Sequence, residues 1–174
     1  MFENAEISLQ HLPGADELEW QALDPRFVKR LQVSGLIGAA IMTCAVLALH
    51  LIQAQIGGHF PVGIAWLAPA VAVFSGLIWP RISVPRKGYA VRDKDIVYKS
   101  GVFWRTVTAV PLNRVQHVET GSTPLDRRFK LATLQLYTAG SAGGDLKIHG
   151  LPAGVAERLR VFVLGKAGAA VEQG

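Results

Sequence analysis

The stretch VPLNRVQHVE, residues 110–119, gathers polar side chains of the types that catalytic and binding sites use. Together with Ser122 and Asp126 a little further on, His117 completes the residue types of a Ser/His/Asp set. A nucleophile in such a set sits at a sharp turn with a recognisable glycine pattern and needs an oxyanion hole. The surrounding residues supply neither motif, so the sequence predicts no catalytic residue.

A metal or cofactor site would need other patterns. His117 and His149 are the one pair that suggests a metal, but zinc sites repeat Cys or His at short spacing and this chain does not. Its single cysteine, Cys44, lies in an apolar run and reads as a small apolar residue. The glycine-rich stretch 139–145 lacks the Gly-Lys-Ser/Thr of a phosphate loop, so we expect a hairpin turn there. The sequence predicts no metal and no cofactor.

These polar residues follow a long stretch without charge. Residues 31–80 contain no Asp, Glu, Lys or Arg. Residues 31–52 are long enough to cross a bilayer as a helix, and 62–79 reach the lower end of that range. The glycines and proline between them favour a turn. We therefore predict a transmembrane helical hairpin over 31–79, preceded by a cytoplasmic segment, 1–30.

Charges at the ends of the hairpin predict its orientation. Basic residues flank it on both sides, and the connecting turn has none. The positive-inside rule then places both termini in the cytoplasm. Small residues four apart, Ser34 with Gly38 and Ala68 with Ala72, are expected to let the helices approach closely. Pro69 is expected to kink the second helix.

Beyond the hairpin the hydrophobic pattern changes to period two, which indicates strands. A turn of helix is expected at 124–128, because Ser122 or Thr123 before Pro124 resembles a helix cap. Val115 is expected on one strand face, and Gln116 and Val118 on the other. The expected strands cover 89–92, 96–99, 102–112, 113–120, 131–138 and 146–150.

The last element is different. Residues 151–165 place apolar side chains on one face of a helix, and residues 166–174 are expected to be a disordered tail. The predicted fold is an α+β membrane protein. Its two-helix hairpin is followed by an antiparallel split sheet or barrel over 80–165, closed by this C-terminal helix.

Several motifs together resemble the YdbS-like bacterial pleckstrin-homology (PH) proteins. They are Ser100-Gly101 before a long strand, Val110-Pro111-Leu112 leading to Arg114 and Gln116, Pro124-Leu125 with Arg128, and Leu131-Ala132-Thr133 ending in Thr138-Ala139-Gly140. Lys130 stands where this family often has glycine. The resemblance implies a pleckstrin-like domain anchored in the bacterial inner membrane, without established enzymatic activity. It also implies a partner, a larger membrane protein with tandem copies of the domain.

The basic residues are the remaining candidates for function. Residues 81–174 carry fifteen Lys and Arg against seven Asp and Glu. Lys99, Trp104 and Arg105 interleave as in single-strand nucleic-acid binders, but a membrane-tethered domain favours lipid or protein as partner. We expect no nucleic acid. The candidates for the membrane surface are Arg81, Arg86 and Lys87, and those for a partner surface are Arg114, Gln116, Arg127, Arg128 and Lys130.

Three functions remain open at this stage. The first is a non-catalytic inner-membrane protein whose cytoplasmic domain assembles with a related membrane protein. The second is a module that binds anionic lipid, and the third is an accessory subunit of an envelope enzyme or transporter.

Overall fold

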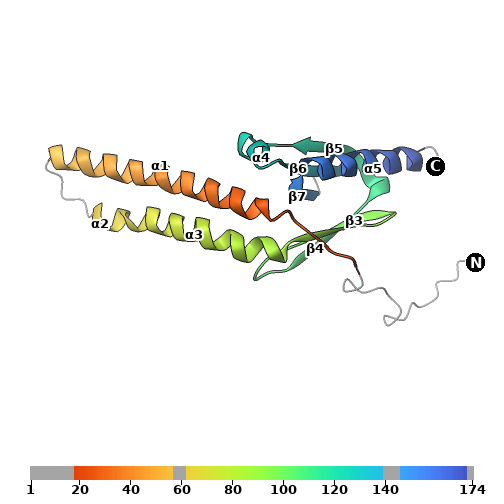
Figure 1. The fold of residues 1–174 in the computed structure, drawn as a ribbon, viewed down its shortest axis with the longest axis horizontal. Coiled ribbons are helices and arrows are strands. Elements are labelled where there is room, and N and C mark those ends of the chain that lie inside the picture. The colour runs from red at the N-terminus through yellow and green to blue at the C-terminus, as the bar shows by residue number, and fades with distance from the viewer. Residues whose placement is uncertain (1–17, 57–61, 139–145, 172–174) are drawn as a thin grey trace, which may run out of the picture.

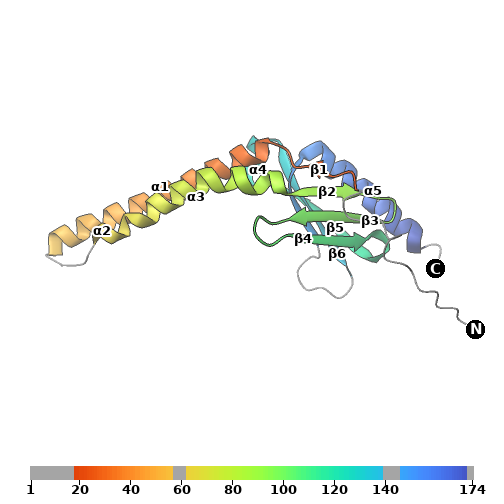
Figure 2. The same cartoon turned by 90° about the horizontal axis from the view of Figure 1, so that it is seen from below.

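The computed structural model describes residues 18–56, 62–138 and 146–171 (Figure 1). The predicted hairpin turn at 139–145 therefore lies outside the described residues, as does most of the turn between the two apolar helices. A helical arm and a domain of two sheets make up the structure (Figures 1 and 2). The arm extends away from the sheets, and α5 runs along the domain in the opposite direction.

The arm contains α1 (Arg26–Ile56), α2 (Val62–Ala65) and α3 (Leu67–Ser83). Two helices, spanning Arg26–Gln55 and Gly63–Arg86, are long and apolar enough to cross a membrane. Both helices are longer than the predicted spans, 31–52 and 62–79. Helix α1 begins at Arg26, and α3 continues through Arg81 to Ser83. Helices α1 and α3 lie side by side along the arm.

Glycine allows the two helices to approach each other. A Cβ on Gly35 would lie 2.6 Å from the Cα of Gly76, too close for any side chain there. Packing of Ser34 and Gly38 against the second helix is not found, because Ser34 is exposed and a Cβ on Gly38 would meet nothing within 4 Å. The contact face lies one residue further along α1, through Gly35 and buried Ala39.

The helix that was expected to kink at Pro69 is interrupted one turn before this proline. Proline has no N–H to donate to the carbonyl four residues earlier, which belongs to Ala65. Helix α2 ends at Ala65, and α3 begins at Leu67 after a turn at Trp66.

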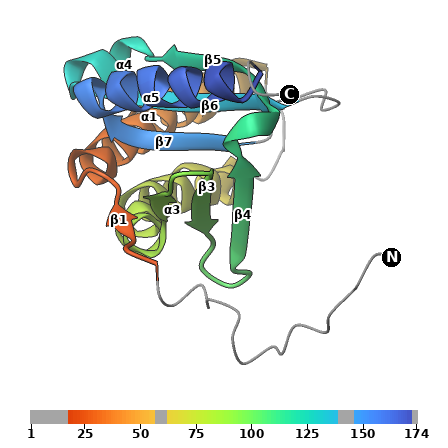
Figure 3. The ribbon, with the colours of Figure 1, turned by 90° about the vertical axis from the view of Figure 1, so that its right-hand side faces the viewer.

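The domain has two open antiparallel sheets (Figure 3), so the predicted α+β class is confirmed. The first sheet has the order β1-β2-β3-β4, and the second has the order β5-β6-β7. Its strands are β1 (Gln21–Ala22), β2 (Gly88–Val91), β3 (Asp95–Ser100), β4 (Thr106–Pro111), β5 (Val115–Gly121), β6 (Leu131–Thr138) and β7 (Leu146–Pro152). The short helices are η3 (Val84–Arg86), η4 (Leu112–Arg114) and α4 (Pro124–Arg128), and α5 (Ala153–Val171) closes the domain.

Helix α5 covers one face of the second sheet. The side chains of Leu134, Leu136 and Ile148 are fully buried, as is Val163 of α5. The predicted inward direction of Leu134 and Leu136 is therefore confirmed. The helix begins at Ala153 and continues past Gly165 to Val171, so the predicted disorder is wrong for residues 166–171.

Two strand predictions are also wrong in detail. Strand β4 begins at Thr106 instead of residue 102, because the chain bends after Gly101, whose φ is 111°. Val115 and Val118 are both buried, whereas they were expected on opposite faces. A register shift between Val115 and His117 adds one residue to β5, and this bulge returns Val118 to the inner face.

The segment before the arm belongs to the domain. Gln21 of β1 pairs with Tyr89 of β2, and the backbone N–H of Asp24 donates to the carbonyl of Gly150 at 3.1 Å. Leu23 and Phe27 are buried in the core. The domain therefore includes residues that precede the hairpin in the sequence, in addition to the predicted range 80–165. Their contacts attach the arm to both sheets.

Candidate functional site

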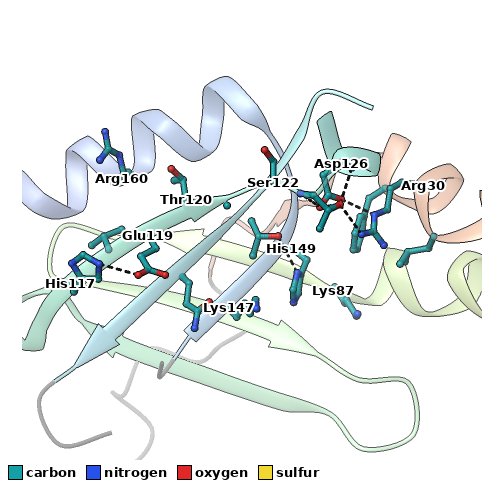
Figure 4. A pocket seen from close by; sticks show the side chains of 17 residues that line it. Arg30, Lys87, His117, Glu119, Thr120, Ser122, Asp126, Lys147, His149 and Arg160 are labelled. Carbon is teal, nitrogen blue, oxygen red and sulfur yellow. Dashed lines mark hydrogen bonds and ion pairs between the residues drawn. The ribbon is translucent and has the colours of Figure 1, made fainter. Parts of the chain in front are cut away.

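A groove of about 820 Å³ runs along the polar face of the second sheet, and Arg160 of α5 also lines it (Figure 4). It runs from His117 and Glu119 on β5 to Arg30 at the base of the helical arm. Its lining includes Arg30 of α1, Lys87 before β2, Glu119 of β5, Thr133 and Gln135 of β6, and Lys147 and His149 of β7.

Strand alternation produces this polar face. In β6 the buried Leu134 and Leu136 alternate with the half-buried Thr133 and Gln135. In β7 the buried Ile148 lies between Lys147 and His149 in the same way. Successive side chains of a strand point to opposite faces, so the residues that bury one face under α5 also place polar groups in the groove.

The end of the groove nearest the arm is closed by an ion pair. Arg30 Nε donates to Asp126 Oδ1 at 2.7 Å. The hydroxyl of Thr123 donates to Asp126 Oδ2 at 2.6 Å, and the backbone N–H of Asp126 donates to the Thr123 oxygen at 3.1 Å. This capping box starts α4, and Arg30 joins it to α1. The same contacts therefore fix the arm against the second sheet.

The charge of Asp126 is stabilised at this junction. Burial alone would raise the pKa of its carboxyl group. Hydrogen bonds from Thr123 and the ion pair with Arg30 outweigh burial, and the pKa is lowered below its usual value. Asp126 is thus an ionised acceptor at neutral pH, with neither oxygen left over for proton transfer.

His149 lies between the ion pair and the open part of the groove. Its ring is parallel to that of Phe27, with 6.5 Å between the ring centroids, and its Nδ1 lies 3.1 Å from the Thr133 hydroxyl. Gly150 makes room for Phe27, because a Cβ there would lie 2.4 Å from the phenyl ring. Burial, followed by the charges of Lys147 and Lys87, lowers the pKa of His149. The imidazole is therefore neutral at pH 7.

The groove has an excess of positive charge. The carboxylate of Glu119 already has two partners. It accepts a hydrogen bond from the Tyr137 hydroxyl at 3.0 Å, and its Oε1 lies 3.2 Å from His117 Nε2. Within the described residues, neither Lys87 nor Lys147 forms a salt bridge. Two ammonium groups without a carboxylate partner create a positive potential that an anionic group would lower.

The residues considered for catalysis are not assembled into a catalytic set. His117 contacts Glu119, whereas Asp126 contacts Thr123 and Arg30. His117 and His149 both line the groove, on β5 and β7, with β6 between them. The described residues contain no group of three His, Cys, Asp or Glu that could hold a metal ion.

The predicted membrane-surface residues lie together at the base of the arm. Arg81 is exposed in the last turn of α3, and Arg86 is exposed in η3, where its Nη1 donates to the carbonyl of Ile82 at 2.5 Å. Lys87 follows directly and lines the groove.

The predicted partner-surface residues are divided between two places. Arg114 and Gln116 are exposed at the start of β5, whereas Arg127, Arg128 and Lys130 follow its end. Arg127 and Lys130 line a second depression, of about 500 Å³, together with Arg26. Lys130 has a φ of 57°, which explains why a glycine suits this position.

Sequence reasoning missed Arg30 and Lys147 as site residues, and it considered His149 only as a metal ligand and set it aside. The signal for Lys147 and His149 was present in their alternation with Ile148, which marks one polar strand face. Arg30 was used only as an orientation signal, because nothing local indicates a pairing with Asp126, 96 residues away.

Comparison with known proteins agrees with this architecture. The bacterial PH domain family matches residues 31–167, which include the helical arm and most of the domain. The UPF0699 transmembrane protein YdbS of Bacillus subtilis (strain 168) is 29% identical over 135 residues, covering 75% of this chain and 80% of that protein. No solved structure gives a significant match. The chain, a membrane protein with a PH-like domain at the base of two apolar helices, belongs to the bacterial PH domain family.

Proposed function

We propose that this protein is a non-catalytic inner-membrane protein whose PH-like domain binds a segment of a partner membrane protein on the cytoplasmic side. The observation that carries the proposal is the groove, which combines surplus positive charge with a position at the base of the arm. A related protein with tandem copies of the domain is the partner that the family resemblance favours.

The lining of the groove favours an extended acidic segment. Lys87 and Lys147 supply ammonium donors, and Thr133 and Gln135 supply further polar groups in the lining. Carboxylates of a bound segment would form charge-assisted hydrogen bonds with the two lysines. The basic groups flank a strand face instead of surrounding a deep pocket, which suits a chain segment better than a small metabolite.

The state of the titratable groups supports a binding role over a catalytic one. General acid–base catalysis needs a group that can exchange a proton with a substrate. Asp126 and Glu119 are both held by neighbouring donors, and His149 is covered on one side by Phe27.

Site-specific photocrosslinking tests the proposal. A benzophenone amino acid in place of Gln135, in the full-length protein at native expression, should capture one membrane protein, identified by mass spectrometry after purification in mild detergent. The matched control places the same probe at Val161, which is exposed on α5 and does not line the groove. Charge reversal, Lys87→Glu with Lys147→Glu, should abolish the crosslink at Gln135. Equal capture from both positions, or none from Gln135, contradicts a partner in the groove.

Anionic lipid is the second candidate ligand, supported by the position of Arg81, Arg86 and Lys87 at the end of α3. Each basic residue at an anionic membrane surface contributes about 1 kcal/mol. If the Gln135 probe captures phosphatidylglycerol instead of protein, and charge reversal removes that adduct, the groove is a lipid site.

A further inference from the structure

The turn between β3 and β4 exposes two large aromatic side chains. Phe103 is 78% exposed and Trp104 is 85% exposed, and they lie close together, with 6.4 Å between ring centroids. Among the residues that the structure describes, no helix or strand covers them. Such exposure is costly in water, so it points to a surface that is covered in the working protein.

The turn between β3 and β4 contacts the helical arm. The ring of Phe103 stacks on that of Trp79, with 6.2 Å between centroids and an angle of 28°. Trp79 lies at the end of the charge-free run of α3, two residues before Arg81. Tryptophan followed by arginine at the end of an apolar helix is typical of the interface between hydrocarbon and headgroups. Figure 2 shows the turn pointing back along α3.

The backbone holds the turn in this conformation. Gly101 has a φ of 111°, and a Cβ there would lie 1.7 Å from the carbonyl oxygen of Trp104. The chain can fold back on itself only with glycine at this position. Arg105 follows Trp104 directly and is also exposed.

We propose that Phe103 and Trp104 form an interfacial anchor, which inserts into the headgroup region of the membrane that α3 spans. The anchor adds a third attachment point to the two helices and thereby sets the tilt of the domain against the bilayer. Trp104, an amphipathic ring, lies at the depth where tryptophan is favoured, and Arg81 and Arg105 face the phosphates. This surface is separate from the groove, so the proposal does not depend on a partner protein.

Quenching of Trp104 by brominated lipid tests the anchor. The full-length variant Trp20→Phe, Trp66→Phe, Trp79→Phe keeps Trp104 as its single tryptophan and retains an aromatic ring for Phe103 to stack on. In vesicles of phosphatidylcholine and phosphatidylglycerol, replacing the phosphatidylcholine by its brominated form should remove most of the Trp104 emission. That emission should also be shifted to shorter wavelength than in water.

A matched control places a tryptophan elsewhere on the domain. Val161 is 61% exposed on α5, which runs away from the arm (Figure 1). With all four native tryptophans changed to Phe, Val161→Trp should show water-like emission and no quenching. If the single-tryptophan proteins do not fold, the comparison of wild type with Trp104→Phe gives the Trp104 contribution by difference. Unquenched Trp104 emission overturns the anchor, whether it is water-like or blue-shifted, since the second result would mean burial against protein.

Discussion

The two faces of the β5-β6-β7 sheet show how the domain divides its residues between stability and binding. One face carries Leu134, Leu136 and Ile148, all fully buried under α5. The other carries Thr133, Gln135, Lys147 and His149, which line the groove. Neighbouring residues of one strand thus have opposite surroundings, and each face can be changed by substitutions that leave the other intact.

The comparison also separates two kinds of charge. At the arm end of the groove, Arg30 and Asp126 satisfy each other and join α1 to α4. Lys87 and Lys147 lie further along the polar face, with no ion pair among the described residues. Paired charges of this kind position elements, whereas unpaired charges attract a ligand. The predictions below test each half of this division.

The largest effect is expected on the apolar face. Leu134→Ala removes a fully buried side chain and leaves a cavity, so it should lower the free energy of unfolding by about 3 kcal/mol. The adjacent Gln135→Ala, on the groove face, should change it by less than about 0.5 kcal/mol. Thermal unfolding followed by circular dichroism in detergent compares the two. Equal losses would mean that the groove face also packs in the folded protein.

The ion pair at the junction should come next. Asp126→Asn leaves Arg30 without a carboxylate and should cost about 2 kcal/mol, less than a fully buried pair because Arg30 is partly exposed. The pKa of Asp126 is lowered below 3.8, so its stabilisation is present above that pH and is lost as the pH falls through the lowered pKa. Wild type and variant should therefore converge at the acid end of a stability titration.

The exposed Asp93 is a control for this titration. It pairs with Lys166 at the surface, and this pair lowers its pKa, but the pair is exposed and screened by solvent. Asp93→Asn should therefore change the stability and its pH dependence much less than Asp126→Asn. A loss from Asp93→Asn as large as that from Asp126→Asn would show that net charge, and not the junction, is responsible.

Local pattern was sufficient for most elements of this chain. The charge-free run predicted two apolar helices, and alternation predicted the strands and the burial of Leu134 and Leu136. The cap and proline at Thr123 and Pro124 predicted α4. These signals are local because they depend on side-chain period or on hydrogen bonds within a few residues.

Features that depend on distant partners could not be predicted in this way. The two-residue β1 is too short to show a period, and it exists because β2 offers a free edge. The bulge in β5 depends on its register with β6. The groove also depends on the ion pair between Arg30 and Asp126. These residues are 96 positions apart in the sequence, and only tertiary packing brings them together.

A smaller effect concerns the turn that leads into β6 and so sets the register of both faces. Lys130 has a φ of 57°, a conformation that costs about 1 kcal/mol for a residue with a Cβ. Lys130→Gly should therefore raise the free energy of unfolding by up to about 1 kcal/mol. Lys130→Ala keeps the strain while removing the charge, so it should give no increase. A gain from the alanine variant would assign the effect to charge.

Lys147→Gln should change the free energy of unfolding least. It is nevertheless the most direct test of the polar face, because it changes the pKa of His149. The charges of Lys147 and Lys87 add to burial in lowering the pKa of His149, with Lys147 the larger of the two. Lys147→Gln should raise that pKa toward 6.5, Lys87→Gln should raise it less, and Lys94→Gln, in the β2–β3 turn, should not change it. Nuclear magnetic resonance of the His149 ring, assigned with His149→Gln, measures each value.

The same resonance reports on the ligand. An anionic group bound between the two lysines would offset their charge and raise the His149 pKa in the wild-type protein. That rise should be smaller when Lys147 is already Gln, because the anionic group then has one ammonium partner fewer and binds more weakly. If Lys147→Gln leaves the pKa of His149 where it is, the charge of Lys147 has no part in the lowering, and burial is its main cause. The two lysines would then be too well solvated to attract an acidic segment to this face.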